Sequence, residues 1–415
     1  MTDPHGSAPR GGDPHVIVFG DVFDDVIVTP SGDIRPDTDT TACIERHAGG
    51  SAANAAAWFG HRGCRVDFAG HVNVDDVAHH ETLLRRHGVT PHLVGDRLPT
   101  GTIVVILQPD RTRTMLTERG ANALTSPGDV DRALFRPGGH LHFTGYSVFR
   151  HGAPDATPAF AALVQDARAA GLSVSVNPGS AGFIAEHGPE GVLAATAGAT
   201  IVLPNLDEGR ALTGADDPDD VVTALLERHE IVALTLGRAG ALVASRAPAA
   251  ATSRVDASPS SDVGDPLGAG PDADGSLGAG RDADGSLGAG RAVGSSIGAG
   301  RDADGSLGAG RAADGSLGAG RAADGSLRVR VSAVPVTPVD TTGAGDAFGA
   351  GFVESLLRSG PVTADAMDAA RLEAAARAGV ACAAVAVTRL GARPPLVGAP
   401  QEHSASRQSP RGADA

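Results

Sequence analysis

The chain of 415 residues contains no lysine, so all 34 of its basic residues are arginine. A Walker A loop places a lysine on the terminal phosphates of a nucleotide, and Schiff-base enzymes use a lysine as nucleophile. Both kinds of site are therefore excluded. If this protein handles phosphate, it must use backbone N–H groups, arginine and metal ions.

Aromatic residues and long apolar runs are also scarce. Aromatics make up only 3% of the chain, which argues against a stacking platform for single-stranded nucleic acid. The 49 acidic residues outnumber the basic ones, and the net charge of −15 would repel a phosphate backbone. No apolar stretch reaches the ~18 residues that a membrane-spanning helix needs. We therefore expect neither a nucleic-acid partner nor a membrane partner.

The three cysteines are Cys43, Cys64 and Cys382, and no CxxC motif is present. An odd number of widely spaced cysteines favours reduced thiols over a disulfide framework. The first fourteen residues lack the apolar segment of a secretory signal. We therefore expect a cytoplasmic protein.

A repeat of six ten-residue units of the type GAGRDADGSL runs from Gly268 to Leu327. Each unit has too little apolar surface to offset the entropy of ordering. We interpret residues 248–327 as a flexible low-complexity insert. A calcium-binding roll and a linker between two domains are the alternatives. The predicted organisation is one domain over 15–397, interrupted by this insert, with disordered tails at 1–14 and 398–415.

Outside the insert, short apolar runs alternate with Ala-rich helical segments. Residues 16–19, 65–69, 103–107, 173–177, 200–205, 231–237 and 240–244 read as strands, and 51–60, 159–170 and 372–387 as helices. This alternation predicts an α/β fold with a mostly parallel sheet covered on both faces. Ligands bind such sheets beyond the carboxyl ends of the strands, where Gly20, Asn177, Asn205 and Gly237 are expected.

The stretch DTTGAGDAFGAGF, from Asp340 to Phe352, is the most informative. It follows a β-like run at 334–339 and continues into a helical segment, so Gly343, Ala344 and Gly345 lie where a helix begins. Unpaired N–H groups at a helix N-terminus bind anions, and glycines let a phosphate approach. Asp346 beside such a site could accept a proton from an attacking hydroxyl. The alternative is that Asp346 only caps the helix.

This stretch closely resembles the second signature of the ribokinase-like (pfkB-type) carbohydrate kinases. The stretch GGSAANAAAWFGHRG from Gly49 to Gly63 is similar to their first signature. Further matches follow in the family's order at 20–25, 100–102, 119–122, 177–178, 204–208, 235–240 and 388–392. The resemblance implies a three-layer α/β/α fold with a mostly parallel central sheet. It also implies a small β-sheet lid, formed by residues 29–44 and 95–118, through which a homodimer could form.

The resemblance also implies roles for individual residues. Sugar hydroxyls would be held by Asp25, for which Asp24 is the competing assignment, and by Gly49, Gly50 and Asn54. Such groups suit a diol, because a carboxylate accepts two hydroxyls while an amide donates and accepts.

On the nucleotide side, the resemblance implies magnesium bound with ATP near Asn205 and Glu208. Asp340 and Thr342 match positions around a monovalent cation, with potassium as the candidate. The implied nucleotide-binding positions are Asn177, Asn205, Thr235, Gly237 and Gly240.

Two departures from the family pattern matter. Ala52 stands where ribokinases have a lysine, which weakens the case for ribose in particular. Asn73 and Ala78 replace two glycines of a turn after the strand at 65–69, which puts the geometry of that turn in doubt.

We therefore predict an ATP-dependent kinase that phosphorylates a hydroxyl, in our interpretation a primary one, of a small sugar such as a pentose, hexose or sugar acid. Transfer would be direct and in line, with Asp346 as base. A nucleoside kinase of the same fold, a non-catalytic sugar-binding regulator and a scaffold built around the repeats remain as alternatives.

Overall fold

The structure, a computed structural model, describes residues 12–107, 113–148, 156–247 and 319–396. The predicted C-terminal tail and most of the predicted insert and N-terminal tail lie outside these ranges. Among the described residues, no helix combines the length and apolar character that a membrane crossing requires. All three cysteines are free, as the expectation of reduced thiols requires.

A large sheet forms the centre of the described chain. Its strand order is β13-β14-β12-β11-β10-β9-β8-β1-β4-β5. The pairs from β11 to β5 are parallel, whereas β12, β14 and β13 pair antiparallel at one edge. The strands are β1 (His15–Phe19), β4 (Arg65–Asn73), β5 (Val89–Asp96), β8 (His140–Thr144), β9 (Ser173–Asn177), β10 (Ile201–Val202), β11 (Ile231–Thr235), β12 (Ala241–Ser245), β13 (Gly320–Arg321) and β14 (Leu327–Val331).

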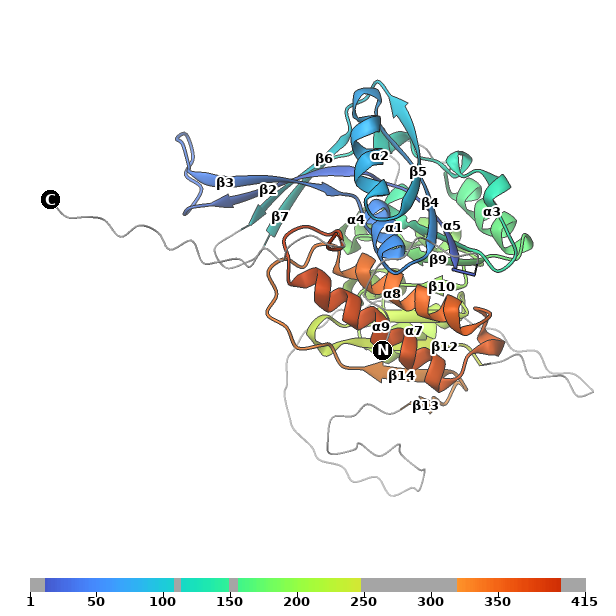
Figure 1. Cartoon of the computed structure of the whole chain (residues 1–415). Coiled ribbons are helices and arrows are strands. Elements are labelled where there is room, and N and C mark those ends of the chain that lie inside the picture. Colours follow the sequence, from blue (N-terminus) through green and yellow to red (C-terminus); the bar gives the residue numbers. More distant parts are fainter. Residues whose placement is uncertain (1–11, 108–112, 149–155, 248–318, 397–415) are drawn as a thin grey trace, which may run out of the picture. The chain divides into compact units, whose positions relative to one another are not determined.

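Alternating apolar residues of the sheet pack into helices on both faces. Val16 and Val18 of β1 belong to one core, whereas Ile17 and Phe19 belong to another. The first core is covered by α1 (Ser51–His61), α2 (Val77–Arg85), α8 (Ala344–Ser359) and α9 (Ala369–Val387). The opposite face is covered by α3 (Ala156–Ala169), α4 (Ala181–His187), α5 (Pro189–Ala195), α6 (Leu206–Thr213) and α7 (Pro218–Leu226). Figure 1 shows α8 and α9 lying side by side. The predicted three-layer α/β/α fold is confirmed.

The strand order reverses at β1, and this reversal positions the site. β1 pairs with β4 on one side and with β8 on the other. In open α/β sheets, ligands bind beyond the carboxyl ends of the strands at such a reversal. Gly20 follows β1 and Thr144 ends β8 at this place.

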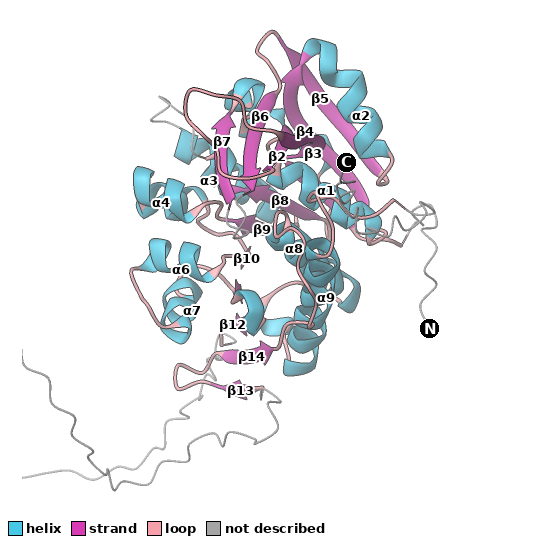
Figure 2. Cartoon of the chain, turned by 90° about the vertical axis from the view of Figure 1, so that its left-hand side faces the viewer, coloured by secondary structure: helices cyan, strands magenta, loops and turns pink. Residues whose placement is uncertain are grey.

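A second sheet of four strands is separate from the first (Figure 2). Its order is β3-β2-β6-β7, and β2 pairs parallel with β6. The strands are β2 (Phe23–Pro30), β3 (Ala42–Gly49), β6 (Gly101–Leu107) and β7 (Arg113–Glu118). The predicted small sheet is therefore present, but it extends to residues 23 and 49, and so includes Asp25 and Gly49.

The β-like run predicted at 334–339 is wrong. After β14 ends at Val331, residues 332–339 form no strand, and Val334, Val336 and Val339 are exposed. Pro335 and Pro338 interrupt this run. Since proline has no N–H to donate to a sheet ladder, valine content alone overstated the strand tendency.

The insert was predicted to extend to residue 327, but its last repeat unit contributes to the sheet. Gly320 pairs with Arg328 and Arg321 with Leu327, so β13 and β14 form an antiparallel hairpin. Ser326, which lies in the sequence between β13 and β14, is buried. Part of the last repeat unit is ordered because β13 pairs with β14. The composition of a single repeat does not reveal this pairing. Residues 248–318 lie outside the described chain.

Candidate active site

Asp346 lies in the first turn of α8 and is buried. Its Oδ1 accepts a hydrogen bond from the hydroxyl of Ser51 at 2.6 Å, and its Oδ2 lies 3.5 Å from the donor Nδ2 of Asn54. Ser51 and Asn54 are three residues apart in α1 and therefore share a face of that helix. The two predicted kinase signatures thus meet at this carboxylate.

The environment of Asp346 moves its pKa towards neutrality. Burial raises the pKa of this carboxyl to about 7, the hydrogen bonds from Ser51 and Asn54 act in the lowering direction, and the charge of Asp21 adds to the rise. A group with a pKa near the working pH suits general-base catalysis. Asp346 therefore has the position and the basicity that a proton acceptor needs.

The glycines before Asp346 form the N-terminus of α8. Gly343 has a left-handed φ of 75°, and a Cβ at this position would lie 2.4 Å from the Cβ of Ala392. Only glycine fits there. The N–H of Ala344 donates to the carbonyl of Thr341 at 3.4 Å, a long bond. A Cβ on Gly345 would lie 3.8 Å from Nδ2 of Asn177, so the end of β9 reaches this loop.

Asp25 lies on β2 directly against the backbone of Gly49. A Cβ on Gly49 would be 2.2 Å from Oδ2 of Asp25, and a Cβ on Gly50, whose φ is 95°, would be 2.3 Å from the carbonyl oxygen of Asp21. Oδ1 of Asp25 and Oδ1 of Asn54 are buried and have no hydrogen-bond partner among the described residues. These acceptors are what the hydroxyls of a ligand would satisfy.

Burial also raises the pKa of Asp25 to about 7. Arg393 opposes this rise, whereas the charges of Asp340, Asp24 and Asp346 add to it. The site therefore holds several carboxylates that raise the pKa of Asp25, and one arginine, Arg393, that lowers it.

Asn205 and Glu208 form a capping box at the start of α6. The backbone N–H and Nδ2 of Asn205 donate to Oε2 and Oε1 of Glu208, at 2.9 Å and 2.7 Å, and the backbone N–H of Glu208 returns a bond to Oδ1 of Asn205 at 2.9 Å. Burial raises the pKa of Glu208 to about 8, and the charge of Asp346 acts in the same direction. The pair is therefore part of the same electrostatic cluster as Asp346.

The remaining residues that were predicted to bind the nucleotide lie at the end of β11 and in the turn that follows. Thr235 ends β11 and bridges to Asn205, whereas Gly237 is exposed in the turn. Gly240 has a φ of 98°, and a Cβ on it would lie 1.9 Å from the carbonyl of Val331. This turn therefore needs glycine for its own geometry.

Asp340 connects two loops. Its Oδ1 accepts from the N–H and the hydroxyl of Thr342 at 2.9 Å and 2.7 Å, and its Oδ2 accepts from the N–H of Gly391 at 3.1 Å. In the part of the chain that the structure describes, no cluster of three or more His, Cys, Asp or Glu residues could hold a metal ion.

Sequence reasoning missed three residues of the site. Ser51 donates to Asp346, Asp21 accepts from the hydroxyl of Thr144 at 3.2 Å and is buried, and Arg393 acts on Asp25. Ser51 could have been found, since it shares a helix face with Asn54. Asp21 and Arg393 carry no local signal, because they reach the site through long-range packing.

His140 and His142 have structural partners in the large sheet. His140 is buried and bonds through Nδ1 to Ser173 and through Nε2 to Ser175, both at 2.7 Å, and His142 bonds Ser175 at 2.8 Å. These contacts lie in the interior of the sheet.

Residues of the two signatures and the buried carboxylates thus lie together in an α/β/α fold. The sequence profile described as "pfkB family carbohydrate kinase" matches residues 13–287 and 311–397. The chain belongs to this family. Members of the family are ATP-dependent carbohydrate kinases, and this kinase shares their fold.

Solved structures agree with the fold of the kinase. An adenosine kinase from Sinorhizobium meliloti is 21% identical, with 93% of this chain and 97% of that chain covered and a TM-score of 0.62. A fructokinase from Vibrio cholerae with fructose, ADP and calcium ion is 22% identical, with 91% and 94% covered and a TM-score of 0.59. A double mutant of that fructokinase with fructose, ADP and potassium ion is 21% identical, with 91% and 94% covered and a TM-score of 0.59. No curated protein sequence matches the chain.

Proposed function

We propose that this kinase transfers the γ-phosphoryl group of ATP to a primary hydroxyl of a small sugar such as a pentose, hexose or sugar acid. The observation that carries the proposal is Asp346. It is buried at the N-terminus of α8, it has a raised pKa, and it contacts Ser51 and Asn54 of the first signature.

Transfer is direct and in line. The sugar hydroxyl gives its proton to Asp346 as its oxygen forms a bond to the γ-phosphorus, and the bond from that phosphorus to ADP breaks. The N–H groups of Gly343, Ala344 and Gly345 at the helix N-terminus stabilise the charge of the transferred group, and the long bond from Ala344 to Thr341 is weak enough to be given up. Asp25, Gly49, Gly50 and Asn54 hold the other hydroxyls of the sugar.

Magnesium fits beside Asn205 and Glu208. Both oxygens of Glu208 already accept one hydrogen bond, so direct binding is limited and binding through water is favoured. Burial beside Asp346 disfavours the charge on Glu208, and a cation would relieve this cost. Bound magnesium would supply neutralisation of phosphate charge. Asn177, Thr235, Gly237 and Gly240 form the nucleotide side of the site.

A monovalent cation, potassium, is proposed near Asp340 and Thr342. The carboxylate of Asp340 is buried and accepts a hydrogen bond from Gly391, which links the loop before α8 to the loop after α9. A cation bound near this carboxylate would stabilise its negative charge and so strengthen the link between the two loops. A homodimer through the small sheet is proposed on separate grounds. Ile44, Met115 and Leu116 expose large apolar side chains there, which a second copy would cover.

The test measures ADP release from Mg·ATP across a panel of pentoses, hexoses, sugar acids and nucleosides, with and without potassium. In Asp346→Asn, turnover with the best substrate falls about 10²–10⁴-fold, because the general base is lost. ATP affinity, measured by calorimetry, is retained.

Asp365→Asn is the matched control, since Asp365 is exposed and outside the site. It keeps wild-type turnover. Near-normal turnover in Asp346→Asn would show that another group takes the proton. Turnover on nucleosides alone would replace the sugar by a nucleoside as substrate.

A further inference from the structure

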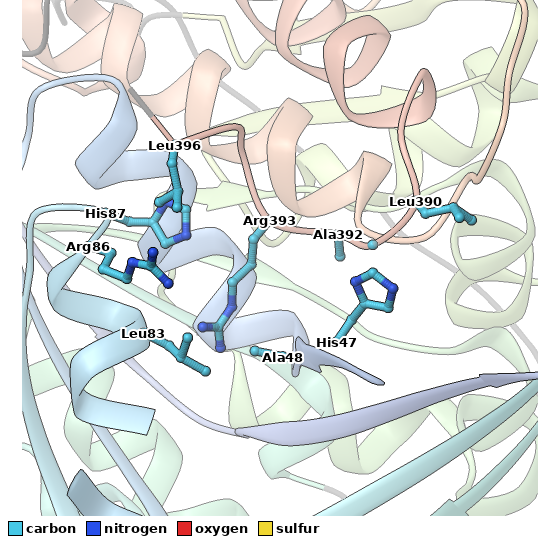
Figure 3. Close-up of a pocket in the computed structure, with 10 residues that line it drawn as sticks. His47, Ala48, Leu83, Arg86, His87, Leu390, Ala392, Arg393 and Leu396 are labelled. Atoms are coloured by element: carbon cyan, nitrogen blue, oxygen red, sulfur yellow. The ribbon is translucent and has the colours of Figure 1, made fainter. Parts of the chain in front are cut away.

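Arg393 follows α9 and lines a cavity of about 150 Å³. Figure 3 shows its side chain reaching from the loop towards Ala48 and Leu83. The walls come from the end of β3 and from the region of α2, and they include His47, Arg86 and His87. The guanidinium therefore lies beside Gly49, the last residue of β3 in the small sheet.

The guanidinium of Arg393 is poorly paired. Its Nε and Nη1 are buried and have no hydrogen-bond partner among the described residues, and its Nη2 donates to the carbonyl of Gly49 over a long 3.4 Å. A buried cation without full pairing costs free energy. The arginine is therefore not explained by its own contribution to stability.

Gly49 lies between Arg393 and Asp25. The guanidinium bonds the carbonyl of Gly49, and the carboxylate of Asp25 lies against the Cα of the same residue, where a Cβ would be within 2.4 Å of its three carboxyl atoms. Oδ1 of Asp25 is also buried and unpartnered in the described chain. The two opposite charges thus both lie against one glycine.

The charges around this pair are unbalanced. Three acidic neighbours raise the pKa of Asp25: Asp24 on the same strand, Asp340 in the loop before α8, and Asp346 on α8. The positive charge of Arg393 lowers this pKa. Arg393 in turn faces Asp24 and Asp25 on β2, His80 on α2, and the cavity residues His47, Arg86 and His87.

We propose that Arg393 is a positioning residue, whose guanidinium acts across Gly49 to keep Asp25 ionised and oriented for the hydroxyls of the sugar. The proposal rests on the proposed role of Asp25 as a sugar ligand. Ionisation matters because only the carboxylate accepts hydrogen bonds from two hydroxyls with both oxygens.

The electrostatics agree with this geometry. Arg393 lowers the pKa of Asp25 against the effect of burial, and that pKa is still about 7. Loss of the arginine would raise it further, so that Asp25 would be protonated at neutral pH.

The test compares Arg393→Gln with Arg393→Lys. Calorimetry without nucleotide gives the Kd of the sugar that is turned over fastest in the panel, at pH 6 to 9. In Arg393→Gln, affinity at pH 7 falls about fivefold or more and recovers towards the wild-type value at pH 9, since a rise of one unit from a pKa of about 7 lowers the ionised fraction at pH 7 from about one half to about one eleventh. Arg393→Lys restores much of the affinity at pH 7, and KM for ATP stays unchanged in both variants.

Arg86→Gln, on the wall of the same cavity, is the control and leaves the pH dependence of sugar binding unaltered. If Arg393→Gln loses affinity equally at pH 7 and pH 9, the arginine has only a structural role and the proposal is wrong. If the loss occurs for sugar acids but not for neutral sugars, Arg393 binds substrate directly, which also overturns the proposal.

Asp25→Asn separates this failure from a failure of the proposed function. Sugar binding that survives Asp25→Asn at every pH means that Asp25 is not the sugar ligand, and then the proposed site is wrong. Sugar binding that is lost in Asp25→Asn, together with a pH-independent effect of Arg393→Gln, rejects only the role of the arginine. Thermal melting of each variant confirms that it is folded.

Discussion

At the scale of single residues, the site is governed by the burial of carboxylates. Burial raises the pKa of Asp346 and of Asp25 to about 7 and that of Glu208 to about 8. Hydrogen bonds and charges then adjust each group. Asp346 can act as the proposed base only when it is unprotonated, so activity should rise with pH through the neutral range and level off above it.

Ser51→Ala tests this balance. The hydroxyl of Ser51 stabilises the charged form of Asp346, so its removal raises the pKa of that carboxyl further. We expect the acid limb of kcat/KM to move to higher pH, and the rate at pH 6 to fall more than the rate at pH 9. The measurement is the pH profile of ADP release.

The control for this variant is Ser359→Ala, at the opposite end of α8. Its profile should match that of the wild type. A uniform loss of rate across the pH range in Ser51→Ala would contradict an effect on the basicity of Asp346.

The sequence indicates candidate site residues but not the contacts between them. Asp346, Gly343 and Asn54 belong to motifs whose glycines and acids have a chemical reason to be there. The bond from Ser51 to Asp346 joins residues 295 positions apart, so no local pattern reveals it. The same holds for Arg393, which reaches Gly49 from 344 positions away.

At the scale of elements, periodicity predicted the buried strands well. The strand at 173–177 and the helix that begins at residue 51 were found where expected, because each has a clear apolar pattern and a clear end. The run at 334–339 was misread, because its valines outweighed its two prolines. Composition also could not show that one unit of a repeat would pair with β14.

Deletions within the insert test the role of the β13–β14 hairpin. One variant lacks 252–316 and keeps β13, and the other lacks 252–326 and loses it. Both shorten the connection after β12 by similar amounts, so the change in loop-closure entropy nearly cancels between them. The second variant also removes the bonds that Arg328 makes to Asp324 and Ser326, at 2.7 Å and 3.0 Å.

We expect the variant without β13 to be less stable than the other by about 1–2 kcal/mol, the loss of a few partly exposed hydrogen bonds. Urea denaturation of the two proteins at one pH measures this difference. Equal free energies of unfolding would mean that the hairpin adds nothing to the fold.

At the scale of the whole molecule, buried histidines should make stability depend on pH. Burial lowers the pKa of His142 and of His229 to about 4, and that of His140 well below its usual value. His140 and His142 lie on β8 in the interior of the large sheet, where burial opposes their protonation in the folded chain.

The direction in which the free energy of unfolding changes with pH follows from proton binding. Between about pH 6.5 and pH 4, the unfolded chain binds protons at these positions that the folded chain does not, so the free energy of unfolding falls as the pH falls through this range. Each such histidine contributes a slope of about 1.4 kcal/mol per pH unit. Above pH 6.5 their full contribution is present, and below the folded pKa it no longer changes.

His142→Leu tests this account, because it removes one buried titrating group and keeps an apolar side chain against Phe59, whose ring lies 5.7 Å from that of His142. Urea denaturation at pH 7, 6 and 5 should give a shallower loss of stability than in the wild type. His79→Gln is the control, since His79 is exposed, and it should keep the wild-type slope. An unchanged slope in His142→Leu would mean that the core stays folded around a charged histidine, and acid sensitivity would then have to come from the carboxylates.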